Sequence, residues 1–332
     1  MYKNNSVKDG VSVISAVKNR AESLLEVLPT WLEHPEVDEI IIVDWGSDIS
    51  LEYLLNEIPD PRILIAIAPD QPKWVLSFAY NLAARFVTRI SMLKLDSDIK
   101  LLPGFFKSCD LIEGEFYTGN WELARTDNER HLNGVLFCRT IDFFRINGYN
   151  EFIKSYGWDD TDLYTRLSSI GLRKRNLNPD FLLHIEHEKR TFFQDHTKFV
   201  RSLDDSERAI FNIMINYQLC SLKAPWSTNN EMMDFRFDWK NDRLVICTQR
   251  SEDKNIISKA EMEESERKAI LQRLTHLKQE LSPEITGLLS KNELKEYYNL
   301  IFSSKSNESD QCILGIIKKI DSLISHKPNQ VP

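Results

Sequence analysis

Buried strands alternate with amphipathic helices over roughly the first hundred residues, and this alternation constrains the fold more than any other feature. Continuous apolar runs predict strands at 11–17, 40–43, 63–67 and 90–95. The segments between them carry apolar residues at helical spacing. The sequence therefore predicts an α/β fold with a Rossmann-like, mostly parallel sheet.

The fourth predicted strand ends in Leu95-Asp96-Ser97-Asp98. Ligands of open α/β sheets bind at the carboxyl ends of the strands, so these carboxylates are candidates for a site. One suits a hard divalent cation, and the other suits a sugar hydroxyl or a metal-bound water. The Asp-x-Asp motif alone is a weak signal, because a second match occurs at Asp160-Thr161-Asp162. A solvated turn is the alternative interpretation.

Asp44 ends the second predicted strand, so the sheet topology can bring it to the same edge. Its carboxylate suits the N3–H of a uracil, while Trp45 or Trp74 suits the face of a ring. The alternative is an aspartate that caps the next turn.

Three acids, Asp159, Asp160 and Asp162, stand at the start of a predicted helix, after Tyr156-Gly157-Trp158. Acids are ordinary at helix N-termini, where they cap the helix or interact with its dipole. A carboxylate held there also suits the role of general base on an acceptor hydroxyl.

Two histidines, His184 and His187, follow a predicted strand at 181–184. Zinc is one reading, although no cysteine or third histidine accompanies them at a suitable spacing. A mixed shell of aspartate, histidine and phosphate suits Mn²⁺ or Mg²⁺ better.

The alternation is lost in the second half of the chain. We expect a catalytic domain over 1–210 and a mainly helical C-terminal extension over 211–332, with helices at 258–281, 284–302 and 311–324. The extension suits acceptor docking, a peripheral membrane contact or self-association.

Composition narrows the partners and the compartment. The net charge of −8 argues against nucleic acid as the main partner. No apolar run reaches the length of a membrane span, which is about 20 residues. The five cysteines are scattered and odd in number, which favours reduced thiols and a cytoplasmic location, including the inner face of the membrane.

Taken in order, these motifs resemble inverting glycosyltransferases of the GT-A fold, in particular the family-2-like group. The resemblance runs over about residues 10–190. The C-terminal half of this group is similar to β-1,4-galactosyltransferases, chondroitin polymerases and polypeptide N-acetylgalactosaminyltransferases. The matching segments are Lys18-Asn19-Arg20, Val43-Asp44-Trp45-Gly46-Ser47, Tyr80-Asn81-Leu82-Ala83, Leu95-Asp96-Ser97-Asp98, Asn147-Gly148-Tyr149-Asn150-Glu151 and Gly157-Trp158-Asp159-Asp160-Thr161-Asp162-Leu163.

The resemblance implies that Asp160 is the general base and that Asp159 holds acceptor or donor hydroxyls. It implies that Asp98 and His187 bind the metal, Mn²⁺ or Mg²⁺, with His184 at a position where some members have a methionine ligand. We expect Asp98 and His187 to share one ion, with Asp160 close to it but not bound. With the two tryptophans above, the predicted donor-binding residues are Asn19, Arg20, Asp44, Trp45, Trp74, Asn81, Asp96, Ser97, Gly134 and Trp158.

The implied activity is a metal-dependent, inverting transfer of a hexose or N-acetylhexosamine (Gal, GalNAc, Glc or GlcNAc type) from a UDP-sugar to a glycan or lipid-linked glycan in surface polysaccharide synthesis. The polar segment 125–133 is expected to close over the donor. Trp158 replaces a glycine of the family's Trp-Gly-Gly motif, which motivates an alternative, a non-catalytic nucleotide- or glycan-binding protein. A nucleotidyltransferase would need a Gly-rich phosphate loop, which the sequence lacks.

Overall fold

The computed structural model describes residues 8–186, 212–213, 216–217, 219–220 and 225–250. The chain divides into two compact units. The first comprises Met1–Phe192 and Ala224–Glu252, and the second comprises Phe193–Lys223 and Asp253–Pro332. The fold described below is that of the first unit.

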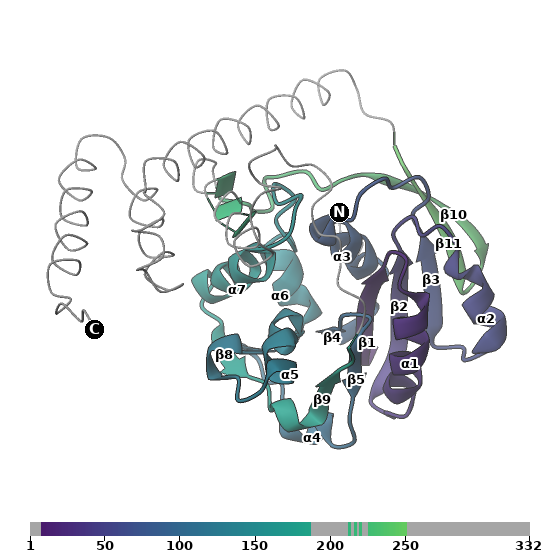
Figure 1. The fold of residues 1–332 in the computed structure, drawn as a ribbon. Helices are drawn as coiled ribbons and strands as arrows, with labels where there is room; N and C mark the ends of the chain where they lie inside the picture. The colour runs from purple at the N-terminus through teal and green to yellow at the C-terminus, as the bar shows by residue number, and fades with distance from the viewer. Residues whose placement is uncertain (1–7, 187–211, 214–215, 218, 221–224, 251–332) are drawn as a thin grey trace, which may run out of the picture. The chain divides into compact units, whose positions relative to one another are not determined.

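The centre of this unit is a mixed sheet, and the described residues contribute nine strands to it (Figure 1). In spatial order the strands are β10 (Phe235–Asn241), β11 (Leu244–Gln249), β3 (Ile63–Ile67), β2 (Val37–Asp44), β1 (Lys8–Val17), β4 (Arg89–Lys94), β7 (Leu136–Arg139), β6 (Glu115–Thr118) and β8 (Arg173–Asn176). The five strands from β11 to β4 run parallel to one another, and β7 is antiparallel to both of its neighbours. The predicted α/β fold with a mostly parallel sheet is therefore confirmed.

Side chains that alternate along the strands build two hydrophobic cores, one on each face of the sheet. Val13 packs into the first core and Ile14 into the second. The first core is covered by α1 (Ala21–Leu32), α2 (Leu54–Glu57) and α4 (Phe105–Ser108). The second is covered by α3 (Leu76–Ala84), α6 (Thr140–Arg145) and α7 (Asp159–Ser169). Because helices cover both faces of the sheet, the central strands are continuous apolar runs.

A second, two-stranded sheet lies beyond the end of β4. It pairs β5 (Ile99–Leu101) with β9 (Leu182–His184) in antiparallel register. Helix α1 holds β5 in place, because the indole of Trp31 donates to the carbonyl of Ile99 at 2.8 Å. This small sheet brings two segments that are more than eighty residues apart to the carboxyl edge of the main sheet.

Short helical turns complete the described fold: η1 (Leu51–Tyr53), η2 (Trp121–Leu123), α5 (Asp127–Arg130), η3 (His131–Gly134) and η4 (Pro179–Phe181). The polar segment at 125–133, expected to close over the donor, thus forms α5 and most of η3. None of the helices in the described part of the chain combines the length and the apolar character that crossing a bilayer requires.

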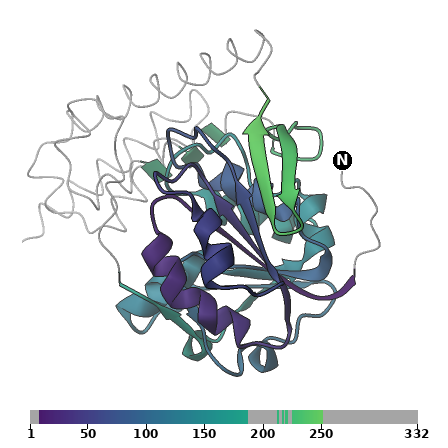
Figure 2. The ribbon, with the colours of Figure 1, turned by 90° about the vertical axis from the view of Figure 1, so that its right-hand side faces the viewer.

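The hairpin of β10 and β11 extends the main sheet at its β3 edge, as the green strands in Figure 2 show. These strands follow residue 210, the predicted end of the catalytic domain, yet they belong to the same unit as β1–β4. The helices predicted at 258–281, 284–302 and 311–324 lie outside the described residues.

Candidate active site

The carboxylate of Asp96 is held by two donors at the end of β4. The hydroxyl of Tyr80 donates to its Oδ1 at 2.8 Å, and the ammonium of Lys94 donates to the same oxygen at 2.8 Å. Tyr80 is fixed by the burial of its ring in the second core. Asp96 keeps part of its side chain exposed, whereas Lys94 is almost completely buried.

Asp98 lies beside His184, as the pairing of β5 with β9 requires. The amide of Ile185 donates to the backbone carbonyl of Asp98 at 2.8 Å, and the Nε2 of His184 lies 3.9 Å from the Oδ2 of Asp98. The guanidinium of Arg20 lies 3.6 Å from the same oxygen. The structure therefore brings together three predicted site residues, from the turn before β5, from β9 and from the loop after β1.

The donor set of Asp98 and His184 fits a divalent metal of the Mn²⁺ type, which accepts carboxylate and imidazole ligands together. Within the described ranges, no group of three or more His, Cys, Asp or Glu side chains is placed to hold a metal. His187, the other predicted ligand, lies outside the described residues. The sharing of one ion by Asp98 and His187 remains a prediction.

Gly134 lies between Asp96 and Asp160. A Cβ atom at this position would lie 2.7 Å from Oδ2 of Asp96, 2.9 Å from Nζ of Lys94 and 3.5 Å from Oδ2 of Asp160. The absence of a side chain therefore lets three charged groups converge at this point. The predicted place of Gly134 in the site is consistent with this geometry.

Asp159 and Asp160 are the first two residues of α7. The hydroxyl of Tyr149 donates to Asp160 at 3.0 Å, and the amide of Asp160 donates to Asp159 at 3.1 Å. Burial and the charge of Asp160 raise the pKa of Asp159 to about 7. Burial also raises the pKa of Asp160, while the ammonium of Lys94 opposes that rise. Trp158, half-buried, precedes the pair with a left-handed backbone (φ of 70°), which is uncommon for a bulky residue.

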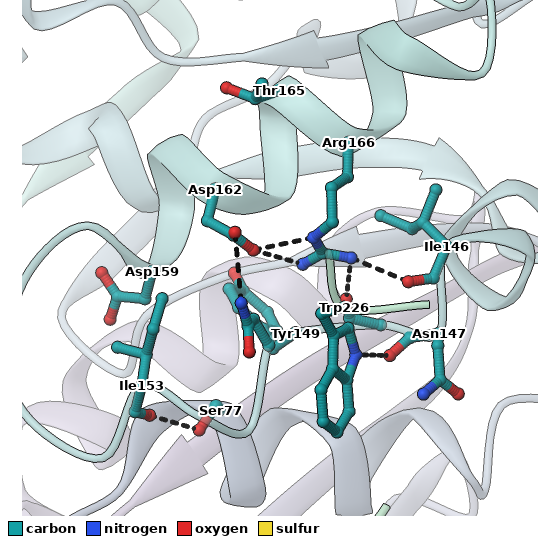
Figure 3. A network of polar contacts seen from close by, with 12 residues as sticks. Ser77, Ile146, Asn147, Tyr149, Ile153, Asp159, Asp162, Thr165, Arg166 and Trp226 are labelled. Carbon is teal, nitrogen blue, oxygen red and sulfur yellow. Dashed lines mark hydrogen bonds and ion pairs between the residues drawn. The ribbon is translucent and has the colours of Figure 1, made fainter. Parts of the chain in front are cut away.

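A polar network anchors the start of α7 to the loop before it (Figure 3). Arg166 donates to the carboxylate of Asp162 at 2.7 Å and to the carbonyls of Ile146 and Gly148 at 2.7 and 2.8 Å. The indole of Trp226 donates to the carbonyl of Asn147 at 2.7 Å. Asp162 therefore has a structural role: its contact with Arg166 helps to hold the start of α7, where Asp159 and Asp160 lie.

Asn81 holds the same loop from α3. Its amide group donates to the carbonyl of Tyr149 and to the carboxylate of Glu151, both at 2.9 Å, and its oxygen accepts the amide of Tyr149 at 2.8 Å. These bonds place Tyr149 against Asp160. Asn81, predicted to bind the donor, is directed toward the protein instead.

The nucleotide side of the prediction is arranged around Asp44. Its two carboxylate oxygens accept the amides of Ser47 and Leu51 at 2.9 and 3.0 Å, which is the turn-capping alternative considered above. Asn19 forms a reciprocal pair of hydrogen bonds with Asp48 at 3.0 and 2.8 Å, which closes the turn.

The two tryptophans predicted near the nucleotide differ. Trp45 is fully buried in the second core, where its ring packs near Phe78 and Phe235 and its indole donates to Lys73. It presents no ring face to a ligand, because the residue is 0% exposed. Trp74 is half-buried at the edge of the same core. Ser97 is buried between the two aspartates.

Sequence reasoning missed four side chains of the site: Lys94, Tyr80, Tyr149 and His131. A lysine inside an otherwise apolar strand was the one signal available for Lys94. The ring of His131 stacks on His184 at 4.3 Å, an arrangement that depends on the pairing of β9. Tyr80 and Tyr149 stand in the motif segments, but the sequence gives no sign of their contacts with Asp96 and Asp160.

Comparison with known families places this site in context. Residues 123–188 match the family model described as the N-terminal domain of galactosyltransferase. The matched segment includes Gly134, the pair Asp159 and Asp160, and both predicted metal-binding histidines. The predicted resemblance to glycosyltransferases is confirmed over this segment. The chain therefore contains a segment that is similar to the N-terminal domain of galactosyltransferase.

Solved structures with related architecture share little sequence with the chain. The catalytic domain of Drosophila β1,4-galactosyltransferase 7 in complex with xylobiose is 13% identical, with a TM-score of 0.47 over 75% of this chain and 97% of that one. The mannosyltransferase PcManGT from Pyrobaculum calidifontis, in complex with GDP-Man and Mn²⁺, is 14% identical, with a TM-score of 0.46 over 66% of each chain. GalNAc-T7 with UDP, GalNAc and Mn²⁺ is 13% identical, with a TM-score of 0.47 over 64% of this chain and 48% of that one. The search of curated proteins found no match.

Proposed function

We propose that this glycosyltransferase is metal-dependent and moves a hexose or N-acetylhexosamine from a UDP-sugar to a hydroxyl of a glycan acceptor with inversion. The observation that carries the proposal is the convergence of Asp96, Lys94 and Asp160 around Gly134. Asp98 lies just beyond the end of β4, next to His184 of β9. A glycosyl transfer needs both a place for a charged diphosphate and a base for an acceptor, and this edge offers both.

Asp98 and His184 would hold the metal, with His187 as the further ligand expected from the sequence. When bound, a divalent cation supplies compensation for the negative charge that builds up on the leaving diphosphate. Arg20, 3.6 Å from Asp98, adds a fixed positive charge on the same side. Asp44 and Trp74 remain the proposed contacts of the uridine.

Asp160 is the proposed general base. It takes the proton of the acceptor hydroxyl, whose oxygen then attacks the anomeric carbon as the bond to the diphosphate breaks and UDP leaves. Attack from the face opposite the leaving group inverts the anomeric centre. The hydrogen bond from Tyr149 orients the carboxylate, and Asp159, whose pKa near 7 leaves it partly protonated, is suited to hold a sugar hydroxyl.

The finer parts of the proposal rest on the sequence. The scattered cysteines support a cytoplasmic enzyme, and Cys109, Cys138 and Cys247 are free thiols. We propose a surface polysaccharide as the product and a lipid-linked glycan as one acceptor class. Sedimentation with vesicles tests a peripheral membrane contact of the C-terminal extension, and light scattering tests its self-association.

The test is a screen of UDP-sugars and glycan acceptors for Mn²⁺-dependent release of UDP with transfer of the sugar. We expect Asp98→Ala and Asp160→Asn each to lower transfer by at least roughly a hundredfold. Asp238→Asn, on the exposed strand β10, is the matched control and should keep wild-type activity. Full activity of both site variants would show that the roles are wrong.

The same screen addresses the non-catalytic alternative, which Trp158 motivates. UDP binding measured by calorimetry, without transfer to any acceptor of the panel, would favour a binding protein. Trp158→Gly is the informative variant, because it restores the smaller side chain of the family motif. A gain of transfer in that variant alone would identify Trp158 as the block.

A further inference from the structure

Lys94 is a charged side chain in the interior of the protein. It ends the central strand β4, and its side chain is 1% exposed. Its ammonium lies 4.5 Å above the ring of Tyr80 and donates to Asp96 at 2.8 Å. A buried ammonium is costly to desolvate unless carboxylates surround it, so its position calls for an explanation beyond packing.

The position of Gly134 shows how close Lys94 lies to the proposed base. The point that a Cβ of residue 134 would occupy is 2.9 Å from Nζ of Lys94 and 3.5 Å from Oδ2 of Asp160. The ammonium and the carboxylate are therefore separated by no more than the sum of these two distances. At such a range, an opposite charge in a buried site strongly favours the ionised carboxylate.

We propose that Lys94 is a positioning residue for sugar transfer, which holds Asp160 in its ionised form and fixes the orientation of Asp96. The inference rests on the proposed function, in which Asp160 accepts the proton of the acceptor. A base that stayed protonated at neutral pH would be inactive, and Lys94 is the cation that prevents this.

The surroundings of Asp160 support this role. Burial raises the pKa of Asp160, and the largest opposing influence is Lys94, ahead of the hydrogen bond from Tyr149. Burial acts to lower the pKa of Lys94 itself, but the charges of Asp96 and Asp160 outweigh it, so the ammonium persists. The titratable groups that face Asp160 are Lys94 and Asp96 from β4 and its end, Tyr80 from α3, Tyr149 from the loop before α7, and Asp159 and Tyr164 from α7.

The deciding variant is Lys94→Met, whose unbranched side chain is shorter by the terminal ammonium alone and carries no charge. Without the ammonium, we expect the midpoint of Asp160 to rise by roughly one to three pH units. Two measurements report it: the acid limb of the pH profile of kcat at saturating donor and Mn²⁺, and the ¹³C carboxyl titration of aspartate-labelled protein without metal. The resonance of Asp160 is assigned from the spectrum of Asp160→Asn.

A purely structural role for Lys94 predicts a different result. Lys94→Met would then lower the folded fraction or kcat and leave both midpoints at their wild-type values, which would overturn the proposal. Asp96→Asn is the control of opposite sign, because the negative charge of Asp96 raises the pKa of Asp160. It should move the midpoint to lower pH.

A second pair of variants keeps the test decisive if Lys94→Met alone fails to fold. Asp96→Asn and the double variant Asp96→Asn/Lys94→Met differ only in the lysine, and neither leaves a carboxylate at position 96 without its partner. The double variant should again have the higher midpoint, and equal midpoints would refute the role. Because the titration needs no substrate, it decides the role of Lys94 even if the wild type transfers no sugar, an outcome that would count against the proposed function alone.

Discussion

Replacing Asp159 by asparagine should make the protein more stable at alkaline pH while it impairs the site. The pKa of Asp159 is raised to about 7 by burial and by the charge of Asp160, whereas an unfolded aspartate titrates near 3.9. Between these two values the folded state binds a proton that the unfolded state has released. The free energy of unfolding therefore falls as the pH rises, and the loss is complete above about pH 7.

The magnitude follows from the two pKa values. A difference of about three pH units corresponds to about 4 kcal/mol at 1.36 kcal/mol per unit. An asparagine amide at the same buried position has a smaller desolvation cost of its own, about 1–2 kcal/mol. We expect Asp159→Asn to gain about 2–3 kcal/mol at pH 8.5, which is roughly 4–12 °C in Tm for a unit of this size.

The assay is thermal and urea unfolding of the metal-free protein at pH 8.5 and pH 4.5. At pH 4.5 the wild-type carboxyl is protonated in the folded state and about four-fifths ionised in the unfolded state, which limits the loss of stability at this pH to about 1 kcal/mol. The gain should therefore shrink by more than half. Asp110→Asn, an exposed aspartate, is the matched control and should change stability little at either pH. An equal gain at both values, or a loss at pH 8.5, would refute the reasoning.

Two further variants test the geometry of the site and of its support. Gly134→Ala should fold normally by circular dichroism yet lose about a hundredfold in kcat, because its Cβ displaces the side chains of Asp96 and Lys94; wild-type kcat would contradict the convergence seen at this position. Arg166→Met should lower the free energy of unfolding in urea by about 3–5 kcal/mol, because it leaves Asp162, whose side chain is 12% exposed, without its ion-pair partner. A loss below about 1 kcal/mol would show that the pair contributes little.

The sequence was informative where the signal is local. The strand at 63–67 was predicted with its observed bounds, because five consecutive apolar residues leave no other face to expose. Strand β8 was missed, since Arg-Lys-Arg-Asn has no apolar pattern and joins the sheet through backbone pairing with β6. β10 was also missed, although its aromatic residues alternate with charged or polar ones.

In the site, too, some features follow from the local sequence and others depend on residues far away in the chain. The placement of Asp96 and Asp98 at the carboxyl end of a strand follows from their position in the chain. The burial of Trp45 does not, because it depends on Phe78 and Phe235, and the latter lies 190 residues away on a strand that was not predicted. Likewise, His184 lies beside Asp98 only because β9 pairs with β5, a register that no local pattern encodes.

The two Asp-x-Asp matches lie in different secondary structure. Asp160 and Asp162 lie in the first turn of α7, where residues two apart point about 200° away from each other. The carboxylate of Asp160 therefore faces Tyr149 and Gly134 in the site. The carboxylate of Asp162 faces Arg166 in the supporting network (Figure 3). A helix cannot present such a pair to one ion.

The match after β4 lies in a turn instead, where Asp96 contacts Lys94 and Asp98 lies near His184, so both carboxylates remain at the sheet edge. Secondary structure thus decides which of the two motifs is able to bind a metal and a donor.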